Sequence, residues 1–195
     1  GVALISSENA KVKVDAKRTM DLHGHANISL EGICSTDIEW LAGDSVEAGF
    51  TKAIDQATIV LAAEMMGSAR EALERTVDFL SEREQFDVKL GTFQALQHRC
   101  AQMFCELELA ESAISAALTG LDRGAPNLSA LASSAKALAN DCFTLISSEA
   151  VQLHGGMGVT EEMDIGLFLK RSRVCNQLLG SSSYHRDRFA RLNGF

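Results

Sequence analysis

The sequence predicts a mainly α-helical protein: an antiparallel four-helix bundle preceded by a few β-strands from an incomplete β domain. Two observations predict this fold. Alternation of apolar and polar residues, which is typical of strands, is confined to about the first forty residues. From Asp44 onward, apolar residues recur every three or four positions in long stretches with short connections. We therefore divide the chain into residues 1–42, the last strands of a middle β domain, and residues 43–195, a helical bundle domain.

Three short segments of the first part favour β-strands. They are "VALISS", "AKVKVDAK", in which Val12 and Val14 alternate with charged residues, and "HANISLEGI", in which Ile28 and Leu30 share a face. So few strands cannot enclose a core of their own. We therefore expect the chain to begin inside a β domain whose other strands are missing.

The helical part opens at Asp44, where Glu47 three residues later gives a start that resembles a capping box. An apolar stripe then continues for about 35 residues. The fourth helix is expected to begin after a cluster of glycines, with Thr160 as its N-cap. Beyond the first helix, we expect helices over about residues 91–121, 129–153 and 160–179, and a short one after "GSSS".

Composition excludes several classes of function. Acidic residues outnumber basic ones by 26 to 18, giving a net charge of −8, which disfavours nonspecific binding of nucleic acid. The five cysteines form no CxxC pair and no cluster at zinc spacing, so we expect no metal site and interpret them as small buried residues in a reduced compartment. No apolar run is long enough to span a membrane and no signal peptide is evident, so we expect a cytoplasmic protein.

The segment "VQLHGGMGVTEE", residues 151–162, carries three glycines in four positions. A helix precedes these glycines, whereas a Rossmann phosphate loop follows a strand, and the Lys-Ser/Thr of a P-loop is absent. Two interpretations remain. Gly155 ends the helix in the left-handed conformation, or a ligand approaches the backbone closely, because one glycine is enough for a cap.

A second segment, "SEREQFDVKLGTFQALQHR", spans residues 81–99 and includes a break between two helices. The planar guanidinium of Arg83 suits a phosphate, and Phe86 can lie against a ring. Alternatively, Arg83 is a surface residue paired with Glu82 or Glu84, and Phe86 fills the corner between the helices.

Three motifs follow one another along the chain: Arg-Glu-Gln-Phe, then Gly-x-Phe-Gln-x-x-Gln-His, then a helix ending in Gln-x-x-Gly-Gly-x-Gly. Taken together, they resemble the C-terminal half of an acyl-CoA dehydrogenase. The resemblance implies an FAD-dependent enzyme that oxidises the Cα–Cβ bond of an acyl-CoA thioester, with FAD at a subunit boundary. It also implies acyl-CoA as the substrate and a homo- or hetero-oligomer, a dimer or tetramer, formed through the helical domain.

The resemblance assigns cofactor-binding roles to eight residues. It places Arg83, Gln85 and Phe86 at the pyrophosphate and ribose, and Gln94 at the adjacent wall. It places Gln152, Gly155 and Gly156 at the adenosine and pyrophosphate end, and Ser181 near the flavin.

The family's chemistry needs a carboxylate to take the α-proton. Leu179 and Ala57 occupy the two positions where the family places it, and neither can accept a proton. Glu64 lies two helical turns after Ala57 on the same face, where it is either a displaced catalytic base or a structural partner of a neighbouring helix.

The ending "GSSSYHRDRFARL" resembles subunits of heteromeric members that act on steroid side chains. Tyr184, His185 and Arg186 are then interface groups or part of a solvated last helix. Three hypotheses follow: a fragment of a competent enzyme with an unusual base, a non-catalytic partner subunit, or a helical assembly module without flavin. We expect the 195-residue chain alone to bind FAD poorly and to be inactive.

Overall fold

The computed structural model describes residues 1–195, which divide into two compact units, residues 1–54 and residues 55–195. The first unit holds two antiparallel strand pairs, and each unit is described here by itself. Strand β1 (Val2–Leu4) pairs with β4 (Glu39–Leu41), and β2 (Val12–Arg18) pairs with β3 (Gly24–Leu30). The structure confirms the predicted mainly helical fold with a few short strands.

The β2–β3 pair places Val12 opposite Leu30 and Val14 opposite Ile28. Val14 and Ile28 are 59% and 64% exposed, so this apolar face is not buried within the unit. Strand β4 was not predicted, because a three-residue strand, "EWL", is too short to show alternation.

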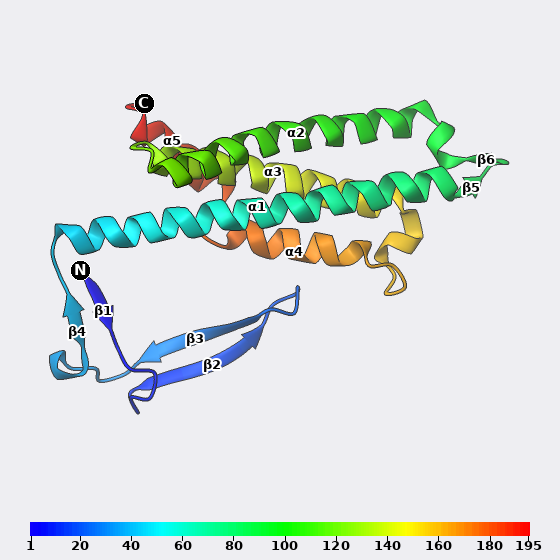
Figure 1. Cartoon of the computed structure of the whole chain (residues 1–195). Helices are drawn as coiled ribbons and strands as arrows, with labels where there is room; N and C mark the ends of the chain where they lie inside the picture. The colour runs from blue at the N-terminus through cyan, green and yellow to red at the C-terminus, as the bar shows by residue number, and fades with distance from the viewer. The chain divides into compact units, whose positions relative to one another are not determined.

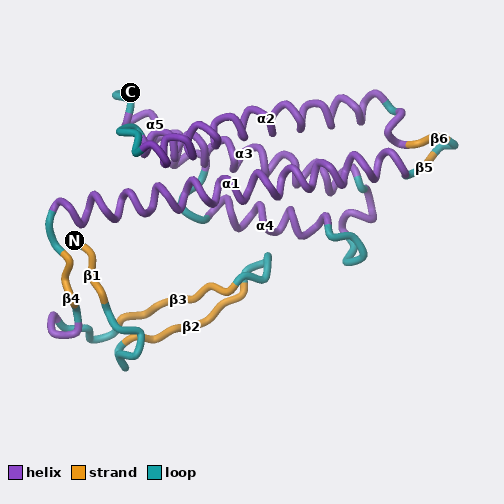
Figure 2. The backbone as a smooth tube through the Cα atoms, in the orientation of Figure 1, coloured by secondary structure: helices purple, strands orange, loops and turns teal.

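The second unit is a bundle of long helices, which Figures 1 and 2 show running alongside one another. Helix α1 begins in the first unit and contributes residues 55–82 to the bundle. The elements are α1 (Asp44–Glu82), β5 (Glu84–Gln85), β6 (Val88–Lys89), the 3₁₀ turn η2 (Leu90–Thr92), α2 (Gln94–Arg123), α3 (Leu128–Leu153), the 3₁₀ turn η3 (Gly155–Val159), α4 (Ile165–Gln177) and α5 (Ser182–Leu192).

Helix α3 lies at the centre of the bundle and packs against α2, α4 and α5. Its buried face combines Phe143 and Ile146 with several alanines. Because the alanine side chain is small, neighbouring helices can approach α3 closely. Buried residues of α1 such as Ile59 and Met65 belong to the same core. No helix is both long enough and apolar enough to cross a membrane.

The start of the fourth helix was predicted wrongly. Helix α4 begins at Ile165 with Asp164 as its N-cap, and the preceding glycines form η3 instead of helix. Glycine disfavours the α-helix because it loses the most backbone freedom on folding. The hydroxyl of Thr160, the predicted N-cap, instead donates a 2.8 Å hydrogen bond back to the carbonyl of Met157.

The break between the first two bundle helices is a small β-hairpin, β5–β6, which the sequence analysis did not predict. Its two-residue loop consists of Phe86 and Asp87, with φ of 58° and 62°. Positive φ at both loop positions is the requirement of a type I′ hairpin turn, usually met by Asn-Gly. Because neither residue is glycine, the sequence carries little sign of this turn.

The cysteines are all free, but only two of them are buried as predicted, Cys142 and Cys175. Cys34 and Cys105 are exposed, and Cys100 is half-buried. Cys105 belongs to an amphipathic helix, α2, and lies on its exposed side, so helical surroundings alone did not indicate burial.

Candidate cofactor site

The three glycines after α3 differ in what explains them. Gly155 follows the C-cap residue His154 and has a φ of 60°, so it ends the helix in the left-handed conformation as predicted. At Gly158, an added Cβ would lie 2.5 Å from the carbonyl oxygen of Val151, so packing excludes any side chain. Each of these two glycines therefore has a reason within the chain.

At Gly156, neither the backbone conformation nor the packing requires a glycine. Its φ lies outside the left-handed region, and an added Cβ would meet no atom within 4 Å. The backbone at this position is open to solvent, so a ligand can approach it directly. The interpretation of the segment as both a helix end and a contact surface thus divides between Gly155 and Gly156.

The β5–β6 hairpin and the η3 turn lie at the same end of the bundle, since each joins one long helix to the next antiparallel one (Figure 1). An aromatic contact joins them. The ring of Phe79, in the last turn of α1, stacks on His154 with 4.2 Å between ring centroids. Nδ1 of His154 also lies 2.8 Å from the carbonyl oxygen of Ala150, which fixes the ring at the end of α3.

Arg83 precedes the hairpin, and its exposed side chain forms neither a hydrogen bond nor an ion pair. The expected alternative, pairing with Glu82 or Glu84, is therefore not adopted. The ring of Phe86 is 83% exposed and meets only the edge of Phe93, at 6.2 Å between centroids, so it does not fill the corner between the helices.

Three glutamines complete this end of the molecule. Nε2 of Gln85 donates a 2.9 Å hydrogen bond to the carbonyl of Glu84. Gln94 is the first residue of α2 and Gln152 lies in the last turn of α3, and both side chains are exposed. We call these seven predicted residues the hairpin-end group: Arg83, Gln85, Phe86, Gln94, Gln152, Gly155 and Gly156.

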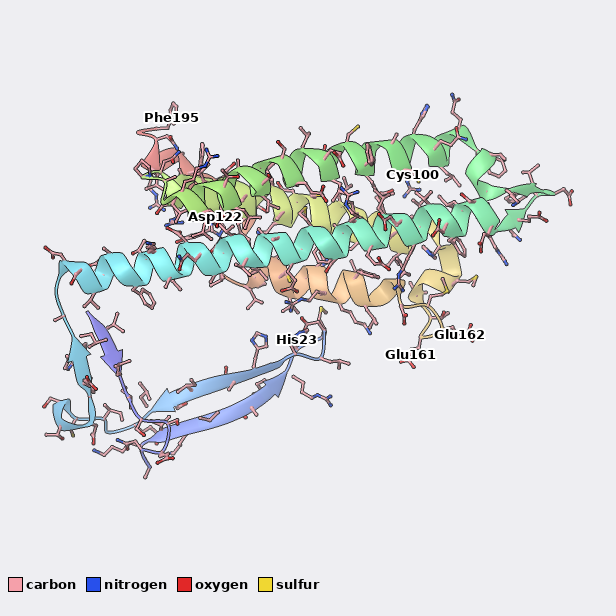
Figure 3. The ribbon with its side chains drawn as sticks, in the orientation of Figure 1. His23, Cys100, Asp122, Glu161, Glu162 and Phe195 are labelled. Atoms are coloured by element: carbon pink, nitrogen blue, oxygen red, sulfur yellow. The ribbon has the colours of Figure 1, made fainter.

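Two exposed acidic residues lie on the loop that follows η3. Figure 3 shows Glu161 and Glu162 projecting from the loop between η3 and α4. Neither side chain forms an ion pair within the chain.

Ser181 lies apart from the hairpin-end group, because the connection between α4 and α5 is at the other end of the bundle (Figure 1). It is the N-cap of α5, and its Oγ accepts a hydrogen bond from the backbone N–H of Tyr184. Leu179, at one of the two expected base positions, is 37% exposed with a φ of 57°. The predicted site residues thus form two groups rather than one.

Glu64 projects from the middle of α1 and forms an ion pair with Arg171 of α4. Its Oε1 atom lies 2.6 Å from Nη2 and 2.9 Å from Nε of the guanidinium. The Glu64 side chain is 49% exposed. The pair gives Glu64 a structural role between two helices, and its role as a catalytic base stays a prediction.

A buried polar cluster that the sequence did not predict lies beneath the α4–α5 turn, the four residues 178–181. Lys136 is completely buried, and its ammonium donates hydrogen bonds to Asn140 and to two backbone carbonyls. Burial lowers its pKa to about 8. The one available signal was a lysine on the apolar face of an alanine-rich helix.

His185 is also part of this cluster, so its side chain is neither at an interface nor solvated, whereas Tyr184 and Arg186 of the same helix are exposed as expected for a solvated helix. It is 1% exposed, and its Nε2 lies 2.9 Å from the carbonyl oxygen of Leu179. Because a carbonyl only accepts, Nε2 carries the proton, and Nδ1 has no partner. Burial lowers the pKa of His185, so the ring is neutral near pH 7.

Known proteins share both the sequence pattern and the fold of this chain. Residues 48–192 match the family model described as acyl-CoA dehydrogenase, C-terminal domain. The chain is 37% identical over 126 residues to acyl-CoA dehydrogenase IpdE2 of Mycolicibacterium smegmatis, covering 65% of this chain and 39% of that protein.

Two solved structures share the architecture. The Tcur3481-Tcur3483 steroid ACAD superposes with a TM-score of 0.88 at 27% identity, covering 99% of this chain and 51% of that one. The ChsE4-ChsE5 complex from Mycobacterium tuberculosis gives a TM-score of 0.84 at 20% identity, covering 98% and 51%. The chain therefore spans about half of each solved chain it matches, and less of the IpdE2 relative.

Proposed function

This chain belongs to the acyl-CoA dehydrogenase family, through that family's C-terminal domain, and on this premise we propose that it forms part of an FAD site. The proposed reaction is oxidation of the Cα–Cβ bond of an acyl-CoA thioester. When bound, FAD would supply the hydride acceptor that amino-acid side chains lack. The chain's own contribution is to bind and orient the cofactor.

The hairpin-end group fits the polar half of such a cofactor. The guanidinium of Arg83 is exposed and unpaired, which leaves its planar donors available for a pyrophosphate. Gly156 offers open backbone that nothing in the chain requires to be glycine. The exposed ring of Phe86 provides an apolar surface beside them. The observation that carries the proposal is Gly156, because packing and backbone conformation leave it unexplained.

The separation of the two groups supports a cofactor shared between chains. Helix α3 alone has 26 residues, or about 39 Å at 1.5 Å per residue, and it connects one end of the bundle to the other. We propose that the hairpin-end group of one chain and the α4–α5 turn of another contact the same FAD. The oligomer then forms through the helical domain, and acyl-CoA binds on the side of the α4–α5 turn.

A non-catalytic partner subunit is a second candidate function, favoured by the absence of a free carboxylate at the three candidate base positions. Leu179 and Ala57 cannot accept a proton, and the carboxylate of Glu64 is neutralised by Arg171. The two similar solved structures, Tcur3481-Tcur3483 and ChsE4-ChsE5, are each named for two proteins. In this version, a partner of related sequence supplies the base while this chain completes the FAD site.

The FAD proposal is tested by flavin retention in the complete protein, expressed from its whole coding sequence. Arg83→Ala and Gly156→Ala should each lower the FAD content after dialysis, because they remove a phosphate donor and fill the open backbone. Lys89→Ala, in the same hairpin, and Gly67→Ala, at an exposed helical glycine with free space around it, are the matched controls. Unchanged FAD content in both test variants would leave the helical assembly module as the remaining hypothesis.

The partner-subunit version is tested separately by Glu64→Gln. Turnover that survives this change, with FAD content intact, removes Glu64 as the base. Co-purification of a related subunit that carries a glutamate at the position of Leu179 then supports the heteromer. Lost turnover in Glu64→Gln, with activity retained in the exposed control Glu74→Gln, instead supports a competent enzyme with a displaced base.

A further inference from the structure

The buried ammonium of Lys136 has no carboxylate partner. Its three acceptors are Oδ1 of Asn140 at 2.6 Å, the carbonyl oxygen of Cys175 at 2.9 Å and that of Gly180 at 3.3 Å. An unpaired buried charge is costly unless hydrogen bonds and dipoles compensate for it. A lysine in this position therefore has a specific structural purpose, and its acceptors identify it.

Two of these acceptors are backbone groups of the α4–α5 turn and the helix end that leads into it. Cys175 lies in the last turn of α4, whose carbonyls have no partner within the helix and carry partial negative charge. The carbonyl of Gly180 accepts a second hydrogen bond, from Nδ2 of Asn140 at 3.3 Å. Helix α3 thus fixes the backbone of the turn through two side chains one helical turn apart, Lys136 and Asn140.

Helix α5 holds the same turn from its other side. Nε2 of His185 donates to the carbonyl of Leu179. Gly180 is in close contact with this ring, since an added Cβ there would lie 2.8 Å from Nε2 of His185 and 2.5 Å from Cδ1 of Tyr184. The carbonyls of Leu179 and Gly180, which lie on either side of the Gly180 Cα, are therefore both fixed by buried donors.

We propose that Lys136 is a positioning residue that, with Asn140 and His185, fixes the backbone of the α4–α5 turn and hence the direction in which the side chain of residue 179 leaves the bundle. In the proposed function, on which this inference rests, that side chain faces the acyl-CoA and flavin side of the site. Leu179 adopts a φ of 57°, and the hydrogen bond that its carbonyl accepts from His185 helps to hold that conformation.

The test uses hydrogen exchange of the 195-residue chain, and so does not depend on FAD. The reporting amides are those of Leu178, Tyr184 and His185, which are hydrogen-bonded within or beside the turn. In Lys136→Met, these amides should exchange at least about tenfold faster than in the unchanged chain. Lys170→Met, at an exposed lysine of α4, is the control and should leave them unchanged.

A second variant separates positioning from general stability. Lys136→Met with Asn140→Leu replaces the polar pair by apolar side chains, which should recover much of the melting temperature lost in Lys136→Met. The carbonyls of Cys175 and Gly180 still lack donors, so the turn amides should remain fast. The proposal is wrong if the turn amides return to their original rate in this variant, or if Lys136→Met accelerates exchange equally in α1 and α2. Either outcome leaves the FAD test above unaffected.

Discussion

Arg188 of α5 and Asp55 of α1 form an ion pair inside the bundle, with 2.7 Å between Nη1 and Oδ1. Asp55 is 1% exposed, and its other oxygen accepts a 2.5 Å hydrogen bond from the hydroxyl of Ser129. Arg188 also donates to the hydroxyl of Ser133 at 3.1 Å. The last helix of the chain is thus joined to the first helix and to α3 by one network, although 133 residues separate the two charges.

Breaking the ion pair between Arg188 and Asp55 should lower the unfolding free energy substantially. Arg188→Met leaves the carboxylate of Asp55 buried without its counter-charge, which costs about 3–5 kcal/mol in unfolding free energy. Arg186, two residues earlier, forms an exposed ion pair with Asp141, so Arg186→Met should cost less than about 1 kcal/mol. Urea denaturation of both variants checks this, and equal losses would mean that burial of the Asp55 pair has no special weight.

Gly180 should not tolerate a side chain. Its φ of 114° is strained for other residues, and a Cβ would overlap Tyr184 and His185. Gly180→Ala should therefore lower the unfolding free energy by about 2–4 kcal/mol. Gly67→Ala should instead be neutral or raise it by about 0.5–1 kcal/mol, since Gly67 lies within a helix with space around it. Thermal unfolding of the two variants distinguishes these opposite effects.

The stability of the chain should rise with pH through Lys136. Burial lowers its pKa from 10.5 to about 8, so between these values the unfolded chain still binds a proton that the folded chain has released. The unfolding free energy then increases with pH, by about 2 kcal/mol from about pH 7.5 to about pH 9.5.

The comparison with Lys136→Met isolates this effect. Burial raises the pKa of Cys142 to about 12, which lowers stability as pH rises because only the unfolded thiol ionises. That contribution is common to both chains and cancels in their difference. A difference between the chains that stays constant over this pH range would contradict the prediction.

The stack of Phe79 on His154 should control the order of the hairpin-end group. Phe79→Ala removes an aromatic contact and leaves space at the end of the bundle, which should cost about 2–3 kcal/mol. Hydrogen exchange should become faster in residues 83–92 and 154–160 first. Val77→Ala, at an exposed position of the same helix, is the matched control. Faster exchange confined to α1 would show that the stack does not connect the two segments.

The long helices could be predicted from the sequence because their apolar pattern repeats over many turns. The short elements and the buried polar contacts could not be predicted. The stripe from Asp44 spans many helical turns, so its period of 3.6 residues is unmistakable. By contrast, the hairpin turn at Phe86 and Asp87 adopts positive φ without glycine, because the flanking strands impose it. Its conformation depends on tertiary context that local residue preferences do not contain.

The candidate site shows the same division. The motifs around Arg83 and Gly156 stood out as sequence, because arginine and clustered glycines have few structural uses in that arrangement. Lys136 did not, since two of its three acceptors lie 39 and 44 residues away and are backbone carbonyls, which every residue possesses. Only the folded chain brings those carbonyls to the lysine.

The turn at residue 179 has a consequence for how the chain can change over evolution. In the arrangement proposed above, its conformation is set by main-chain carbonyls held by Lys136, Asn140 and His185. Leucine and glutamate can therefore replace one another there without rebuilding the backbone. Substitution at this position is then decoupled from folding, so an acidic side chain can be gained or lost there while the helical bundle keeps its structure.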